Sequence, residues 1–96
     1  MKKPKIVWDD FAKQELKAIY NYYKPISKKV ADAILDNISN GIKEIRFTHQ
    51  YQKDILQPEY RRLIVDHYKI SYMAEAEKIT ILSIFDTRQD PNKQNF

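Results

Sequence analysis

The sequence predicts an α+β fold in which a long helical hairpin packs on one face of a small antiparallel sheet. Two segments in the first half of the chain repeat apolar side chains at helical spacing, and three segments in the second half follow the period of a strand. A short β-branched segment precedes the helices, so the expected order is β-α-α-β-β-β. The length of 96 residues allows one core, and residues 1–96 are therefore expected to form a single domain.

The first element is a strand that leads directly into a helix. The segment Lys5 to Trp8, KIVW, is rich in β-branched residues, and Asp9 or Asp10 can cap a helix by accepting hydrogen bonds from its free N–H groups. Lys24-Pro25 ends this helix. Between these limits one helical face carries the apolar side chains of Ala12, Leu16, Ile19, Tyr20 and Tyr23.

A second helix is predicted from Ser27, its capping residue, to Arg46. Gly41 lies inside this pattern at a cost of about 1 kcal/mol relative to alanine, so it indicates close packing or an early end of the helix. The segment Phe47 to Glu59 has no clear period and is expected to be a loop. The helical repeat that should face the first helix consists of Ala31, Ile34, Leu35, Ile38, Ile42 and Ile45.

Three strands complete the predicted fold, at Tyr60 to Val65, His67 to Met73 and Lys78 to Phe85. Their short connections indicate an antiparallel meander. In the middle strand apolar residues alternate with Lys69, Ser71 and Met73, so one face can receive the helices while the other carries a lysine. The last strand is apolar on both faces and should be central.

Composition excludes several classes of function. The net charge is +4, with 17 Lys and Arg against 13 Asp and Glu, which favours an anionic partner, either nucleic acid or an acidic protein. There is no cysteine, and two histidines alone cannot hold a zinc ion, so no metal or cofactor is expected. No segment reaches the roughly 20 apolar residues that span a bilayer, so we expect a cytoplasmic protein without a membrane partner.

The candidate functional residues are cations of the predicted sheet. Arg61 opens one strand, Lys69 lies in the next, and Arg88 follows the last. If they converge on an exposed sheet face, their guanidinium and ammonium groups suit phosphate or carboxylate. The alternative is that charges on edge strands resist aggregation and that Arg88 pairs with Asp86 or Asp90. His67 stands beside a turn, where a solvated histidine is commoner than an acid or base.

The order of the elements and three motifs resemble the RelE/ParE family of type II toxin-antitoxin toxins, also described as plasmid-stabilisation proteins. The motifs are WDDFAKQELKAIYNYY, YRRLIVDHYKISYM and, most specifically, ITILSIFDTRQDP. The resemblance implies a helical hairpin on a small sheet and an antitoxin partner that wraps the toxin. It also implies that toxin and antitoxin can form a hetero-oligomer. It also implies that Arg88 lies at the mouth of the functional surface, where Asp90-Pro91 ends the strand.

Two activities divide the family. RelE-like members cut mRNA in the ribosome with sheet cations and a C-terminal Tyr or His, whereas ParE-like members act on DNA gyrase. Arg61, Lys69 and Arg88 match family cations by position, but the tail after Arg88, QDPNKQNF, contains no Tyr or His. That tail and the two long helices favour a ParE-like gyrase inhibitor. The alternatives are a ribosome-dependent mRNA interferase, which is an enzyme, and a family-fold protein without toxicity.

Overall fold

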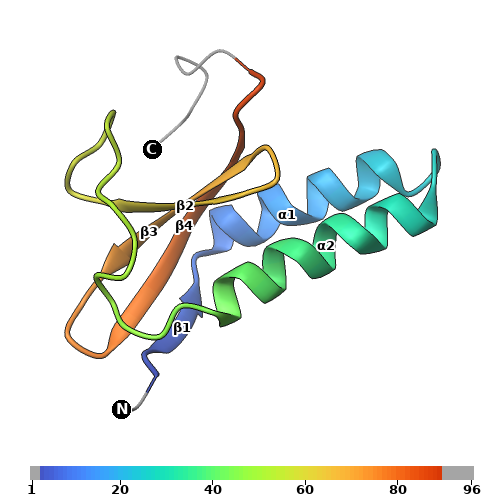
Figure 1. The fold of residues 1–96 in the computed structure, drawn as a ribbon. Helices are drawn as coiled ribbons and strands as arrows, with labels where there is room; N and C mark the ends of the chain where they lie inside the picture. The colour runs from blue at the N-terminus through green and yellow to red at the C-terminus, as the bar shows by residue number, and fades with distance from the viewer. Residues whose placement is uncertain (1–2, 90–96) are drawn as a thin grey trace.

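The structure is a computed structural model that describes residues 3–89. Its elements follow the predicted order, with two helices packed against a sheet of four strands (Figure 1). The bounds are β1 Lys5–Trp8, α1 Asp10–Tyr23, α2 Lys28–Lys43, β2 Arg61–Val65, β3 Tyr68–Ala74 and β4 Lys78–Asp86. The α+β class and the element order predicted from the periodicities are confirmed.

The sheet has the strand order β1-β4-β3-β2, so the apolar strand β4 lies inside it, as predicted. The meander of β2, β3 and β4 is antiparallel. In contrast, β1 pairs in parallel with the first half of β4, from Lys5 opposite Lys78 to Trp8 opposite Ile81, which makes the sheet mixed. A parallel pair needs a long crossover, and here the whole helical hairpin and two further strands separate the partners.

Side-chain caps begin both helices. The Asp9 carboxylate accepts a hydrogen bond from the Phe11 N–H at 3.1 Å, and the Ser27 hydroxyl accepts one from the Val30 N–H at 3.2 Å. Helix α1 has the predicted bounds, but α2 ends at Lys43, before the predicted Arg46. The apolar repeat continued past the helix because Ile45, which is 1% exposed, still enters the core from the following turn.

Gly41 marks the close approach of α2 to β2. A Cβ atom at this position would lie 2.6 Å from Cγ2 of Val65, which is too close for two carbon atoms. The sequence left open whether Gly41 indicates close packing or an early end of the helix. Close packing applies, because the helix continues for two more residues, to Lys43.

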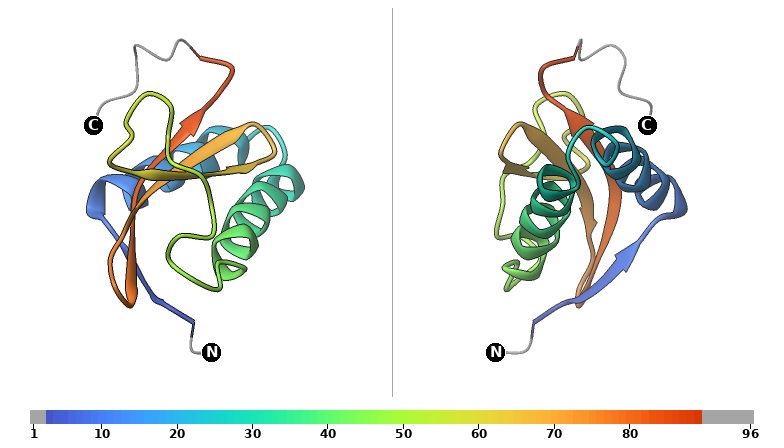
Figure 2. Two further views of the ribbon diagram at one scale, coloured as in Figure 1. Left: turned by 60° about the vertical axis from the view of Figure 1, so that its left-hand side comes forward. Right: turned by 90° about the vertical axis from the view of Figure 1, so that its right-hand side faces the viewer.

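The core lies between the hairpin and the sheet face that carries Leu63, Tyr68, Ile70 and Tyr72. Ala12 of α1 and Ile38 and Ile42 of α2 pack against this face. The long connection between α2 and β2 runs beside β2, and Figure 2 shows it from two sides. It is tied to the edge strand by the bridge of Lys53 with Arg61 and by the hydrogen bond from the Arg62 N–H to the Gln52 carbonyl at 3.0 Å.

Candidate functional site

Arg88, just past the end of β4, is held by a carboxylate two residues before it. Its Nε and Nη2 atoms donate to the two carboxylate oxygens of Asp86 at 3.1 and 2.9 Å, and its backbone N–H donates to Oδ1 at 2.9 Å. Nη2 also donates to the Tyr23 hydroxyl at 3.3 Å. The pairing with Asp86 that the sequence left open is present, whereas Asp90 and Pro91 lie outside the described residues.

This pairing sets the charge state of the strand end. Hydrogen bonds from Arg88 lower the pKa of Asp86, and the carboxylate in turn raises the pKa of Arg88. Burial, with a smaller contribution from neighbouring Tyr23, raises the pKa of Tyr68 to about 12. Beside the Tyr23 hydroxyl, Arg88, Asp86 and Tyr68 therefore carry one guanidinium, one carboxylate and one neutral hydroxyl at neutral pH.

His67 belongs to the same strand end, although its position in the sequence did not indicate this. Tyr68 pairs with Asp86 in the sheet, which places His67 opposite Thr87. The Thr87 N–H and hydroxyl donate to the His67 carbonyl at 2.8 and 2.7 Å, and His67 Nε2 lies 4.0 Å from Asp86 Oδ2. The signal that could have revealed the contact was the strand register, which the short turn at Asp66 fixes.

Lys69 is buried, and the expectation that it lies on an exposed sheet face is wrong. It is 7% exposed, and its Nζ atom lies 3.0 Å from Oδ2 of Asp54, which is 3% exposed. Asp54 comes from the connection between α2 and β2, which covers Lys69 at this point. A buried charge needs such a partner. The connection between α2 and β2 has no periodic pattern, so the sequence did not indicate that Asp54 would be buried beside Lys69.

Arg61 is bound to the same connection, by its Nη1 atom, which donates to the Tyr51 carbonyl at 2.8 Å. In the sheet Arg61 pairs with Tyr72, whereas Lys69 pairs with Ile64. Because side chains alternate along a strand, Arg61 and Lys69 leave the sheet on opposite faces. Arg88 lies beyond the end of β4 with α1. The structure thus does not bring the three predicted cations onto one face, and each has a protein acceptor.

A groove of about 510 Å³ opens between α1 and the last residues of β4. Glu15 stands in it and accepts a hydrogen bond from the Ile84 N–H at 2.9 Å, and burial raises the pKa of this carboxyl. Tyr22, which is 64% exposed, and Arg88 form its far end. Sequence reasoning missed this groove, because it depends on where α1 lies relative to the edge of β4.

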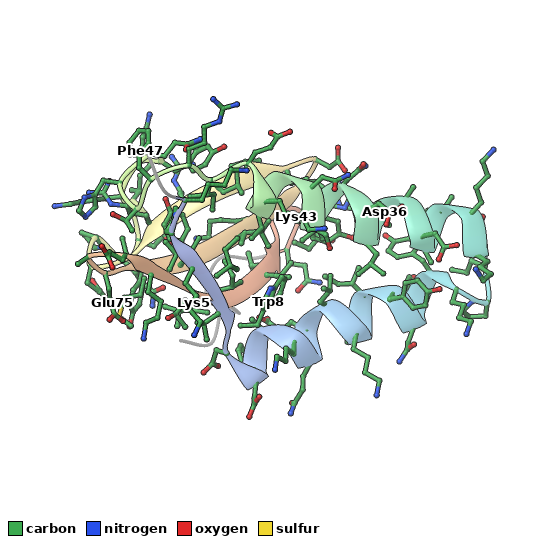
Figure 3. The ribbon with its side chains drawn as sticks, turned by 90° about the horizontal axis from the view of Figure 1, so that it is seen from below. Lys5, Trp8, Asp36, Lys43, Phe47 and Glu75 are labelled. Atoms are coloured by element: carbon green, nitrogen blue, oxygen red, sulfur yellow. The ribbon has the colours of Figure 1, made fainter. Side chains whose placement is uncertain are left out.

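A second hollow, of about 800 Å³, lies at the opposite end of the molecule, among Lys3, Lys5, Phe47 and Lys78. Figure 3 shows Lys5 and Phe47 at this end, together with Glu75. Two of its three lysines already have acceptors, since Lys3 donates to the carbonyl of Lys43 at 3.3 Å and Lys78 lies 3.7 Å from Glu75. Lys3 therefore binds the end of α2, and Lys78 pairs with a residue of the β3–β4 turn.

Within residues 3–89, no three His, Asp or Glu side chains gather closely enough to hold a metal ion. In the same part of the chain, neither helix has the length and apolar character that crossing a membrane requires.

Comparison with known proteins identifies the family. The family model described as ParE toxin of the type II toxin-antitoxin system, parDE, matches residues 6–91. The chain belongs to the ParE toxin family. The resemblance found in its three motifs is thereby confirmed, and the chain is a toxin of the type II toxin-antitoxin class.

Solved structures agree on the fold of this ParE-family chain. A chain described as "Chromosomal ParDE TA system from P. aeruginosa" is 20% identical, and the match covers 86% of the present chain and 95% of that chain with a TM-score of 0.75. At this identity the likeness concerns the fold alone. A search of curated protein sequences found no match.

Proposed function

We propose that this ParE-family toxin acts by inhibiting DNA gyrase and is neutralised by a cognate antitoxin. The proposal rests on family membership for the class and on one structural observation for the target. That observation is the ion pair between Lys69 and Asp54, which removes the central cation of the sheet from solvent.

An mRNA interferase of the alternative kind needs cations that can reach a scissile phosphate and groups that transfer protons. Arg61 and Lys69 point to opposite faces of the sheet, and Arg88 is engaged by Asp86. His67 lies beside Arg88, but its Nε2 atom is buried and faces Asp86, not solvent. These placements favour a toxin that acts by binding a protein target over one that cleaves RNA.

The experiment compares two purified reactions. With gyrase, ATP and relaxed plasmid, we expect the protein to inhibit supercoiling, and with ribosomes and a translated mRNA we expect no new 5′ ends. Adding the antitoxin encoded beside the toxin should restore supercoiling. Codon-positioned mRNA cuts that vanish in Arg88→Ala, at an exposed position, would overturn the gyrase assignment in favour of the interferase. Inactivity in both reactions would favour a family member without toxicity.

A further inference from the structure

The hollow of about 800 Å³ lies between two segments whose backbones are fixed by hydrogen bonds. On one side is the start of β1 with the β3–β4 turn, where the Lys5 N–H donates to the Glu77 carbonyl at 2.9 Å. On the other side is the turn after α2, which the Gln50 N–H closes by donating to the Phe47 carbonyl at 3.2 Å. Sites for small organic ligands have volumes of about 300–1,000 Å³, so this hollow is preformed at a suitable size.

Three lysines line the hollow, and the sheet register places two of them side by side. Lys5 is the direct partner of Lys78 in the parallel pair of β1 and β4, so the two side chains leave the same face of the sheet. Like charges at such positions repel each other. An anion bound between the two ammonium groups would replace this repulsion by attraction to both.

Within residues 3–89 the charges of these lysines are balanced only in part. The exposed side chain of Lys5 has no hydrogen bond or ion pair there, and Lys3 donates at 3.3 Å to a backbone carbonyl, which is neutral. Lys78 lies 3.7 Å from Glu75 in an exposed pair that water screens. The lining itself holds three lysines and one carboxylate, that of Glu77, so it favours an anionic ligand.

Phe47 gives the hollow an aromatic wall. Its side chain is 51% exposed, and it lines the hollow together with the apolar residues Pro4 and Ala76. An exposed ring of this kind can stack on a planar base, a contact that every nucleobase permits. Thr48 and Glu77, also in the lining, add oxygen atoms that can hydrogen bond to the hydroxyls of a sugar.

The groove beside β4 does not offer the same chemistry. Its lining contains the carboxylates of Glu15 and Asp86 and one cation, Arg88, which already binds Asp86 through Nε and Nη2. An anion placed in this groove would face an excess of negative charge. The two hollows therefore differ in the sign of the ligand that they favour.

We propose that the hollow at the start of β1 binds a phosphorylated nucleoside, with its phosphates between Lys5 and Lys78 and its base against Phe47. Lysine suits phosphate because its ammonium group is a mobile point charge. An acidic peptide would also pair with the lysines, but it would leave the exposed ring of Phe47 without a stacking partner. A free nucleotide and an unpaired nucleotide of a DNA strand both supply this chemistry. The inference does not depend on gyrase as the target.

NMR titration of the purified protein with ATP tests the site. We expect the amide signals of Lys5, Thr48 and Lys78 to shift, and those of Ala18 and Tyr22, in the groove beside β4, to stay in place. A 5′-phosphorylated thymidine tetranucleotide is the second probe. Shifts at the hollow with the tetranucleotide alone would assign the site to a DNA strand, and shifts with ATP alone would assign it to a free nucleotide. The absence of shifts with both probes at about millimolar concentration would overturn the proposal.

Two substitutions separate the role of the ring from that of the charge. Phe47→Leu keeps an apolar side chain but removes the ring, so it should weaken ATP binding at least about fivefold and leave the affinity for inorganic pyrophosphate unchanged. Lys5→Gln should weaken the binding of both ligands at least about threefold, because each depends on the ammonium group. Phe11→Leu and Lys17→Gln, at exposed positions of α1 outside the hollow, are the matched controls and should change neither affinity.

Circular dichroism should show all four variants folded, and isothermal titration calorimetry measures the affinities. If Phe47→Leu left the affinity for ATP unchanged, the hollow would bind an anion without recognising a base, and the nucleoside assignment would be wrong. If Lys17→Gln weakened ATP binding as much as Lys5→Gln, binding would follow the net charge and not this site. A tetraglutamate peptide that shifted the same amides when neither nucleotide probe did would also contradict the proposal.

Discussion

Lys69 carries a charge into a part of the sheet from which water is largely excluded. Its only acceptor among the described residues is Asp54, at 3.0 Å, and both side chains are almost completely buried. In such a pair the two charges have lost their hydration, so each depends on the other. Lys69, one of the three cations that the sequence offered as functional candidates, is therefore part of a buried ion pair in the structure.

Lys69→Met should lower the free energy of unfolding by about 3–5 kcal/mol, because it leaves the buried Asp54 carboxylate without a charged partner, with only the Leu56 N–H donating to it. Urea denaturation measures this. Lys28→Met is the control, since Lys28 and Asp32 form an exposed pair of similar length, 2.9 Å, that water screens and that should contribute little to stability. The double variant Lys69→Met with Asp54→Leu should recover much of the loss. Equal losses for Lys69→Met and Lys28→Met would contradict this account of the buried pair.

Glu15→Gln should remove a pH dependence of stability. Burial raises the pKa of Glu15 above its usual value of 4.5, so its contribution to stability is fully present below about pH 4.5 and is lost as pH rises through the folded pKa. The glutamine carbonyl can still accept from the Ile84 N–H. The variant should therefore gain stability relative to the wild type at pH 7 but not at pH 4, measured by urea unfolding at both pH values.

Glu77→Gln, at an exposed glutamate, controls for the loss of a charge. If the difference in stability between Glu15→Gln and the wild type were the same at pH 4 and pH 7, folding would not raise the pKa of Glu15.

The elements were largely predictable, because each depends on local patterns. Apolar spacing and capping residues gave α1 its bounds, and alternation located the three strands of the meander. The end of α2 was placed too late because Ile45 remains in the core after the helix has ended. The apolar period indicates which side chains are buried, but a side chain in a turn can be buried as completely as one in a helix. The period therefore does not show where the helix ends.

Gly41→Ala should destabilise the protein by about 1 kcal/mol, although alanine is the better helix former. The new Cβ atom would lie 2.6 Å from Cγ2 of Val65, and the cost of overpacking, about 1–3 kcal/mol, exceeds the gain in helix propensity of about 1 kcal/mol. Val65 is β-branched and cannot easily turn away. Thermal unfolding would measure the loss.

Asn40→Ala is the neighbouring control, at an exposed position of the same helix, and should stabilise slightly. Adding Val65→Ala to Gly41→Ala should remove the clash. If Gly41→Ala alone raised the melting temperature as Asn40→Ala does, the approach of α2 to β2 would be looser than described.

On the scale of the whole molecule, the features that the sequence did not reveal are contacts between distant segments. The parallel pairing of β1 with β4, the cover that Asp54 places over Lys69, and the approach of His67 to Asp86 each join residues that no local pattern relates. Resemblance to the toxin family supplied the fold and the class, but not which cations reach solvent. That depends on the path of the aperiodic connection between α2 and β2.

The pairing of β1 with β4 also has a consequence for synthesis. Lys5 pairs with Lys78, which is translated only after both helices and two further strands, so the sheet cannot close until β4 has left the ribosome. The groove beside β4 forms at the same moment, because β4, the last element among residues 3–89, is its strand wall. A product of translation interrupted before β4 would therefore lack both the closed sheet and the groove.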